Sequence, residues 1–378
     1  MASSNRGLNK PQSSRISALS SLHPLFSSIL TIFSSLLSPL LTLNTLYLIL
    51  NTTRITIQSM CNTDTEDVEA TVAQIHALEA EGCELIRVAV PTMKAAEALK
   101  KIKSQIKIPL IADIHFNADL AIAAIENGAD KIRINPGNIS DKKRLREIIE
   151  LAKRKNIMIR IGVNEGSLEE DLMRLYGPHS AEALAESAIR WVKFFVKNKF
   201  KNLVVSVKSS DVLTTIKANR ILAKKCNYPL HIGVTEAGTR ETGTIKSSIG
   251  IGALLADGIG STIRVSLSAD PIEEIRVAKK ILDALGIIRL PLRIIACPTC
   301  GRTRANVPAI AEDLEKNLKP KKPLTVAVLG CGVNVKGESQ SADFTIIPAG
   351  TNTFSLFRKT KPILKNVSYK QILKHIQS

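Results

Sequence analysis

Short apolar runs alternate with longer helical patterns along the chain from Arg54 onward. The runs are rich in β-branched residues, which favour strands. They predict strands at 55–59, 85–90, 109–114, 131–134, 157–163, 203–207, 230–235 and 262–267. The intervening segments predict helices at 64–81, 93–104, 119–127, 141–155, 181–199, 211–225, 246–257 and 271–285. Many of these segments end at Gly or Asn, as helix C-termini commonly do.

Eight successive strand–helix units indicate a parallel sheet, and eight is the number that closes a (β/α)8 TIM barrel. A doubly wound open sheet is the alternative, but the glycine-rich phosphate fingerprint that would support it is missing. After Pro291 the pattern predicts strands at 292–296, 324–329 and 344–347 and helices at 308–318 and 368–376. We therefore expect a barrel domain at 54–290 and a small α+β domain at 291–378.

Residues 1–50 have a different composition from the rest of the chain. Half of them are Ser or Leu, and no acidic residue precedes Asp64. Three interpretations compete, namely a membrane anchor or signal segment, a transit-type leader, and a mis-assigned or frame-shifted start. We favour the last and exclude this segment from the fold prediction.

The net charge and the cysteine content limit the classes of partner. The chain has 52 Lys and Arg against 34 Asp and Glu, for a formal net charge of +18. This charge favours anionic substrates and acidic protein partners. Aromatic residues are only 4% and no arginine-rich block occurs, so we expect no nucleic-acid binding. Six cysteines in 378 residues indicate free thiols in a reducing, cytoplasmic compartment, and we expect no membrane association.

Polar residues at the C-terminal ends of barrel strands are the ones that carry chemistry. Here those positions hold Arg87, Asp113, His115, Arg133, Arg160, Asn164, Lys208, Thr235, Glu236, Arg264 and Ser266. Five are cations from five strands, and burying that much like charge is unfavourable unless an anion neutralises it. Because the forked donors of Arg match phosphate oxygens, a diphosphate is the expected ligand. The alternative is that each Arg reaches solvent or pairs with an acid of the barrel.

Two of these side chains are candidates for proton transfer. His115 follows Asp113 at a strand end among the cations, which favours binding or proton transfer over a structural role. Glu236 is a carboxylate at the barrel mouth that can act as acid or base, with pairing to an Arg as the alternative. Cys61, Cys83 and Cys226 have no metal-ligand spacing and are expected to be small apolar core residues.

Three cysteines near the C-terminus form a candidate metal site. Cys297 and Cys300 have a Cys-x-x-Cys spacing, and Cys331 follows about thirty residues later. Three thiolates are one short of a closed zinc or iron–sulfur site. Glu338, on an expected Gly-flanked loop, can supply an oxygen ligand that iron in a sulfide cluster holds less firmly than thiolate. The alternative is a structural zinc held by the cysteines, with Glu338 on the surface.

These residues resemble the bacterial 4-hydroxy-3-methylbut-2-enyl diphosphate synthase family of the non-mevalonate isoprenoid pathway. The matching segments run in order through most of the chain. They are 57–60 (IQSM), 86–91 (IRVAVP), 112–116 (ADIHF), 133–138 (RINPGN), 160–164 (RIGVN), 207–211 (VKSSD), 235–238 (TEAG), 264–267 (RVSL), 297–300 (CPTC) and 330–338 (GCGVNVKGE).

The resemblance implies a (β/α)8 barrel followed by a domain that binds a [4Fe–4S] cluster. The implied cluster ligands are Cys297, Cys300, Cys331 and Glu338. The implied diphosphate-binding residues are Arg87, Arg133, Arg160, Asn164, Lys208, Arg264 and Ser266, with Asp113, His115, Thr235 and Glu236 nearby. The implied catalytic residues are His115, Glu236 as a proton donor, and Glu338 as an exchangeable ligand.

The reaction that the resemblance implies is the reductive ring opening and dehydration of 2-C-methyl-D-erythritol 2,4-cyclodiphosphate. Ferredoxin or flavodoxin would supply two electrons. Family members are homodimers in which the cluster domain of one subunit covers the barrel mouth of the other. Two other functions compete, namely a zinc-stabilised barrel similar to pteroate synthase, without redox chemistry, and an inactive member of the family.

The chain departs from the family pattern in two places. The Ser/Leu-rich segment replaces the usual N-terminal hairpin region, which predicts an incompletely closed barrel floor. The family loop Asn-Gly-Pro-Gly-Glu is replaced by 334–338 (NVKGE), which predicts a strained turn before Glu338.

Overall fold

The computed structural model describes residues 54–115, 117–135, 138–139, 141–333 and 335–377. The expectations for residues 1–50 and for the barrel floor that they would close lie outside this part of the chain. Within the described residues, no helix is both long and apolar enough to cross a membrane.

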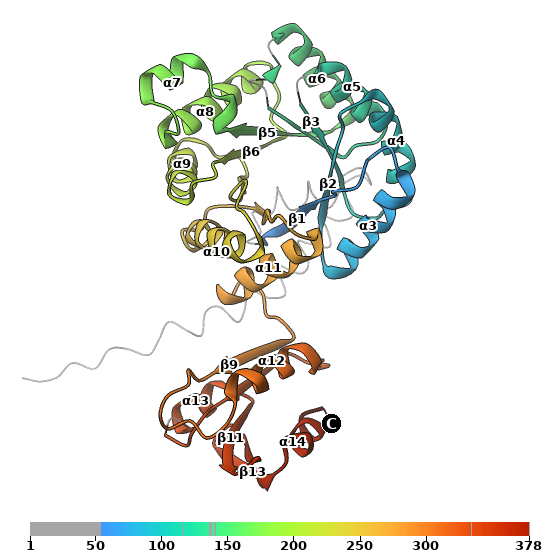
Figure 1. The fold of residues 1–378 in the computed structure, drawn as a ribbon. Coiled ribbons are helices and arrows are strands. Elements are labelled where there is room, and N and C mark those ends of the chain that lie inside the picture. The colour runs from blue at the N-terminus through green and yellow to red at the C-terminus, as the bar shows by residue number, and fades with distance from the viewer. Residues whose placement is uncertain (1–53, 116, 136–137, 140, 334, 378) are drawn as a thin grey trace, which may run out of the picture. The chain divides into compact units, whose positions relative to one another are not determined.

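Eight parallel strands form a ring that is surrounded by helices (Figure 1). The strands are β1 Thr56–Met60, β2 Leu85–Ala89, β3 Leu110–Ile114, β4 Lys131–Ile134, β5 Met158–Asn164, β6 Leu203–Lys208, β7 His231–Ile232 and β8 Thr262–Ile263. Their order is β6-β5-β4-β3-β2-β1-β8-β7. A parallel bridge between Val205 and Leu230 joins β6 to the start of β7 and closes the ring. The predicted (β/α)8 barrel is therefore confirmed.

Polar side chains cap the first turns of the barrel helices, with two exceptions. The helices are α3 Val68–Glu81, α4 Met93–Lys103, α5 Ala118–Glu126, α6 Lys142–Lys155, α7 Glu170–Tyr176, α8 Ala181–Lys197, α9 Val212–Lys225, α10 Arg240–Ala256 and α11 Pro271–Ala284. Among the described residues, no N-cap side chain bonds to the first turn of α7 or α10. The Asp67 side chain accepts a hydrogen bond from Ala70 N–H, so α3 starts at Val68 rather than at 64. The expected start of α10 near 246 is wrong, because the helix already begins at Arg240. The short helix α7 was not predicted.

The two faces of each barrel strand have different chemistry. Side chains alternate across a strand, so every second residue faces the helices. On β4, Ile132 and Ile134 belong to the apolar core between strands and helices. Lys131 and Arg133 therefore face the inside of the barrel. The same alternation turns Arg87 and Arg160 inward and leaves an interior that is unusually polar.

The chain after the barrel forms a second sheet with its own core. The five strands are β9 Leu292–Ala296, β10 Leu324–Val328, β11 Phe344–Gly350, β12 Thr353–Arg358 and β13 Lys361–Val367, in the order β13-β12-β11-β10-β9. The helices are α12 Val307–Asn317, α13 Val335–Ser341 and α14 Tyr369–Gln377. Leu314, Val326 and Leu356 are fully or almost fully buried in the core. Strands β12 and β13 were missed, and the loop expected around Glu338 is helix α13 instead.

Candidate functional site

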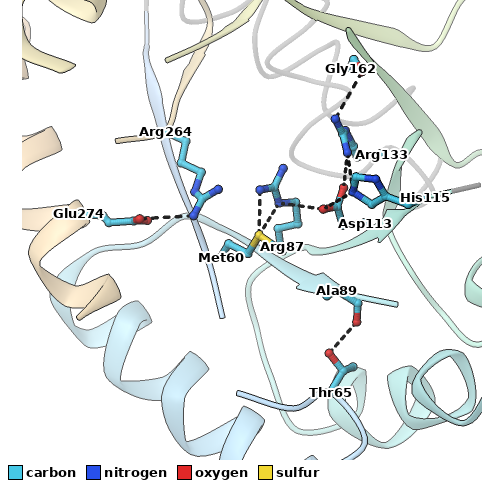
Figure 2. Close-up of polar contacts among 10 residues, drawn as sticks. All are labelled: Met60, Thr65, Arg87, Ala89, Asp113, His115, Arg133, Gly162, Arg264 and Glu274. Carbon is cyan, nitrogen blue, oxygen red and sulfur yellow. Dashed lines mark hydrogen bonds and ion pairs between the residues drawn. The ribbon is translucent and has the colours of Figure 1, made fainter. Parts of the chain in front are cut away.

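Five cations lie inside the barrel toward the C-terminal ends of the strands. They are Arg87 on β2, Arg133 on β4, Arg160 on β5, Lys208 on β6 and Arg264 directly after β8. Four of them are 2% to 9% exposed, and the Arg264 side chain is 17% exposed. Figure 2 shows Arg87 and Arg133 reaching Asp113, and Arg264 reaching Glu274.

Asp113 is the acid at the centre of this group. Its Oδ1 accepts from Arg133 Nη1 over 3.2 Å, and its Oδ2 lies 3.9 Å from Arg87 Nε and 3.4 Å from His115 Nε2. Burial alone would raise the pKa of Asp113, but Arg87, His115 and Arg133 hold it well below its usual range. One buried carboxylate thus faces several buried cations.

The positive charge of the interior is only partly compensated. Burial, opposed by Asp113 and aided by repulsion from Arg264 and Arg133, lowers the pKa of Arg87 to about 9. Burial, followed by repulsion from neighbouring cations, also lowers the pKa of Arg160 and Lys208 well below their usual values. Such a group favours an anionic ligand, because an anion would remove the repulsion.

Several donors of these arginines have no acceptor. Among the described residues, Arg133 Nε, Arg160 Nε and Nη1, and Arg264 Nε are buried without a hydrogen-bond partner. Unsatisfied buried donors cost free energy, so a native protein is expected to fill them with a ligand or water. Phosphate oxygens carry the acceptors that fit these donors.

The cysteines that follow strands β9 and β10 in the second domain form another candidate site, which is suited to a metal group. Cys297, Cys300, Cys331 and Glu338 line one pocket of about 260 Å³. Parallel strands β9 and β10 end at Ala296 and Val328, so the segments that follow them emerge side by side. The Cys297 N–H donates to the Val328 carbonyl over 3.0 Å, and the Cys300 N–H donates to Thr303 Oγ1 over 2.9 Å.

The donors of this pocket fit an iron–sulfur group. Hydrogen bonding from Arg302 N–H, aided by the Arg302 charge and opposed by burial, lowers the pKa of Cys300 and favours its thiolate. Glu338 lies in α13, which begins at Val335, and neither Val335 nor Lys336 has a positive φ. The turn predicted to be strained includes residue 334, which lies outside the described residues. No three His, Cys, Asp or Glu side chains among the described residues surround a common point suited to a single metal ion.

Comparison with known protein families identifies both domains. The profile of the GcpE TIM-barrel domain matches residues 46–279, and that of the GcpE protein C-terminal domain matches residues 293–378. The chain belongs to the GcpE family. It is similar to proteins named 4-hydroxy-3-methylbut-2-en-1-yl diphosphate synthase (flavodoxin) from several bacteria.

The similarity to these GcpE relatives extends over most of both chains. The protein from Caldanaerobacter subterraneus subsp. tengcongensis is 52% identical over 323 residues, which cover 85% of this chain and 90% of the relative. The protein from Persephonella marina is 49% identical over 320 residues, with 84% and 90% covered. A solved dihydropteroate synthase from Stenotrophomonas maltophilia covers 63% of this chain and 95% of its own at 14% identity and a TM-score of 0.46. A TM-score of this size supports no functional conclusion.

The remaining predicted site residues of this GcpE protein lie at the ends of the strands. Arg133 Nη1 donates to His115 Nε2 over 2.9 Å. In the amide orientation that satisfies both of its groups, Asn164 accepts from Arg133 Nη2 over 3.2 Å. Thr235 and Ser266 are half-buried after β7 and β8. Glu236 is exposed, with a positive φ of 49°.

Two glycines that make room for the cations were not predicted as site residues. A Cβ at Gly162 would lie 2.5 Å from Arg133 Nε, and a Cβ at Gly233 would lie 2.3 Å from the Arg264 carbonyl oxygen and 3.1 Å from Lys208 Nζ. A glycine inside a strand is a sequence signal for such close approach.

The sequence analysis also did not predict two further contacts of the arginines. Met60 Sδ lies 2.8 Å from Arg87 Nη2 and 3.0 Å from its Nε. Glu274 on α11 accepts from Arg264 Nη2 over 3.3 Å and from Ser59 Oγ over 3.0 Å. No sequence signal marks either contact, because each joins two different elements that only the fold brings together. The three scattered cysteines, by contrast, are buried as predicted, and burial raises the pKa of Cys61 and Cys83 to about 12.

Proposed function

We propose that this chain is a 4-hydroxy-3-methylbut-2-enyl diphosphate synthase of non-mevalonate isoprenoid biosynthesis. It converts 2-C-methyl-D-erythritol 2,4-cyclodiphosphate into (E)-4-hydroxy-3-methylbut-2-enyl diphosphate by reductive ring opening and loss of water. Membership in the GcpE family supports the reaction. The observation that carries the substrate class is the group of five inward-facing cations opposed by few acids.

The barrel residues bind and orient the diphosphate of the substrate. The donors without acceptors on Arg133, Arg160 and Arg264 face the interior and can bond phosphate oxygens directly. Each hydrogen bond to a charged group contributes about 1.5–3 kcal/mol. Asn164, Thr235 and Ser266 add neutral polar groups at the rim, while Asp113 keeps Arg87 and Arg133 in position.

Cys297, Cys300, Cys331 and Glu338 would hold a [4Fe–4S] cluster in their common pocket. A cluster of four irons takes one protein ligand per iron, so it does not need three ligands around one ion. The cluster, when bound, would relay the two electrons from the donor protein one at a time and would supply Lewis-acidic iron. Glu338 is the weakest of the four ligands, because carboxylate oxygen suits iron in a sulfide cluster less well than thiolate does.

One proton completes the reaction. Two electrons break the ring C–O bond to phosphate and form the double bond, and the departing hydroxyl group takes a proton to leave as water. Glu236 at the rim of the mouth is the proposed donor of this proton. His115 Nε2 accepts a hydrogen bond from Arg133 and lies 3.4 Å from Asp113 Oδ2, and the ring can hold the substrate or relay a proton to it.

The proposed partners and assembly are supported by the resemblance to the family and by the charge of the chain. We propose flavodoxin as the electron donor, with ferredoxin as the alternative, and the net charge of +18 favours encounter with such acidic proteins. We propose a cytoplasmic homodimer with a barrel domain at 54–290, a cluster domain at 291–378 and a separate segment at 1–50. In the dimer, the cluster domain of one subunit would cover the barrel of the other.

Anaerobic purification followed by metal analysis tests the proposal. We expect a brown protein with about four irons per chain and no zinc. With reduced flavodoxin and the cyclodiphosphate, it should form the linear diphosphate at a rate proportional to cluster content. A colourless zinc protein, or a fully loaded protein without turnover, would refute the proposed reaction.

A further inference from the structure

A layer of buried polar side chains lies inside the barrel, nearer the N-terminal ends of the strands than the five cations. It contains Lys131 on β4, His231 on β7 and Gln58 on β1, which are 6%, 1% and 1% exposed. The proposed reaction gives these residues no role. An ammonium group in such a place is costly unless it has a use or loses its proton.

The neighbours of Lys131 do not neutralise it. Its register partners are Ile111 on β3 and Met158 on β5, which are both apolar. Within the described part of the chain, no hydrogen-bond acceptor is bonded to the Lys131 ammonium. The adjacent Asp130 is engaged elsewhere, since its Oδ2 accepts from Lys103 Nζ over 2.6 Å and from the Leu110 N–H over 2.7 Å.

Lys131 has both cations and acids near it, but the acids are engaged by other groups. Arg133 follows it on β4 and Arg160 lies on β5, while Asp130 directly precedes β4 and pairs with Lys103. Asp113 on β3 faces Arg87 and Arg133. His231 on β7 is the remaining titratable neighbour. Burial, together with repulsion from Arg160 and against the opposing charge of Asp130, lowers the pKa of Lys131 to about 7. Burial, with Arg160 and Lys208, keeps the pKa of His231 well below its usual value. The positive groups above Lys131 are the same cations that are proposed to bind diphosphate.

We infer that Lys131 takes up a proton when a diphosphate fills the barrel, and that it thereby strengthens the binding without touching the ligand. This inference rests on the proposed function for the class of ligand. The phosphate charge would offset Arg133 and Arg160, so their repulsion of a protonated Lys131 would fall. Lys131 is therefore a positioning residue that adds its charge to the site only when the anion is present.

The sign of the pH dependence follows from linkage. The bound state would hold the Lys131 proton more tightly than the free state does. The resulting gain in affinity is complete below about pH 7, where Lys131 is already protonated in the free protein. It is lost as the pH rises above that value toward the higher pKa of the bound state.

Calorimetry with inorganic pyrophosphate tests the inference on the full-length, anaerobically purified protein. Titrations at about pH 8 in two buffers of different ionisation enthalpy give the number of protons taken up on binding. Wild type is compared with Lys131→Met, whose side chain suits the apolar neighbours, and with Lys155→Met, which removes an exposed lysine at the end of α6. Subtracting the variants cancels the protons that pyrophosphate itself exchanges.

We expect wild type and Lys155→Met to take up about half to one proton more than Lys131→Met. Lys131→Gln should match Lys131→Met in proton uptake, and Lys131→Met should keep or raise the thermal midpoint, because an apolar side chain replaces a buried amino group that has no hydrogen-bond acceptor among the described residues. Equal proton counts with pyrophosphate bound to all variants would overturn the inference and leave the proposed function standing. If pyrophosphate binds to none of them, the diphosphate site and the inference both fail.

Discussion

The barrel interior and the cysteine pocket hold their polar groups in opposite ways. The barrel cations lie on or directly after strands and are almost fully buried, so β-sheet hydrogen bonds position them before any ligand arrives. The cysteine-pocket ligands lie on loops and one short helix, and Cys300 is exposed. The barrel site is therefore preorganised, although its buried cations repel one another. The geometry of the cysteine pocket, in contrast, depends on the group that it binds.

The largest effect should come from breaking the pocket while leaving the barrel intact. Cys331→Ala removes one thiolate ligand, so the cluster should become labile and turnover should fall at least about 10³-fold, since both electrons would pass through it. Pyrophosphate binding should stay within about twofold of wild type, because the barrel cations are unchanged. Iron analysis, turnover and calorimetry measure the three quantities.

The matched control for this variant is Cys226→Ala, which alters a buried barrel cysteine that is 8% exposed. It should keep its iron and lose only about 1 kcal/mol of stability. Full turnover by Cys331→Ala would break the contrast between the two sites.

The next effect should come from the acid that compensates the barrel cations. Asp113→Asn leaves Arg87 and Arg133 without their carboxylate, and breaking a buried ion pair lowers the free energy of unfolding by about 3 kcal/mol. The folded-state pKa of Asp113 is depressed, so its contribution is present above the ordinary value of 3.8 and is lost as the pH falls through the folded-state value. Urea unfolding of both proteins should therefore differ most near neutral pH and converge in acid.

Asp171→Asn is the control on the surface, where Asp171 pairs with Arg190 over 2.6 Å and is 58% exposed. An exposed pair should contribute less than about 1 kcal/mol. Equal losses in the free energy of unfolding would mean that the buried Asp113 carboxylate contributes no more to stability than an exposed one.

The smallest effect should come from replacing a single barrel cation, which should change ligand affinity and stability in opposite directions. Arg160→Met removes a buried cation that has two donors without acceptors. The affinity for pyrophosphate should fall about 10- to 100-fold, which corresponds to the loss of a charged hydrogen bond. The free energy of unfolding should stay the same or rise, because a desolvated charge is removed.

Arg220→Met serves as the control, because Arg220 is exposed and pairs with Asp257 at the surface. It should change neither quantity measurably. A clear loss of stability in Arg160→Met would indicate that this arginine supports the fold rather than the ligand.

Local sequence patterns were enough to predict the (β/α)8 barrel, because the periods of strands and helices and the residues that end them are local properties. It also marked the five barrel cations, since polar residues at strand ends reach the same mouth in any such barrel. Helix α13 and strands β12 and β13 were not predicted. The helix has only seven residues, and most residues of the two strands are partly or fully exposed, so neither strand shows a clear apolar pattern.

Which polar and charged side chains contact one another across the barrel could be read only from the folded structure. The pairing of Asp113 with Arg87 and Arg133, the space that Gly162 leaves for Arg133, and the engagement of Asp130 away from Lys131 all depend on contacts between different elements. The burial of a residue and its electrostatic interactions depend on all the strands around it. Local pattern therefore names the candidates, whereas packing decides which of them carry uncompensated charge.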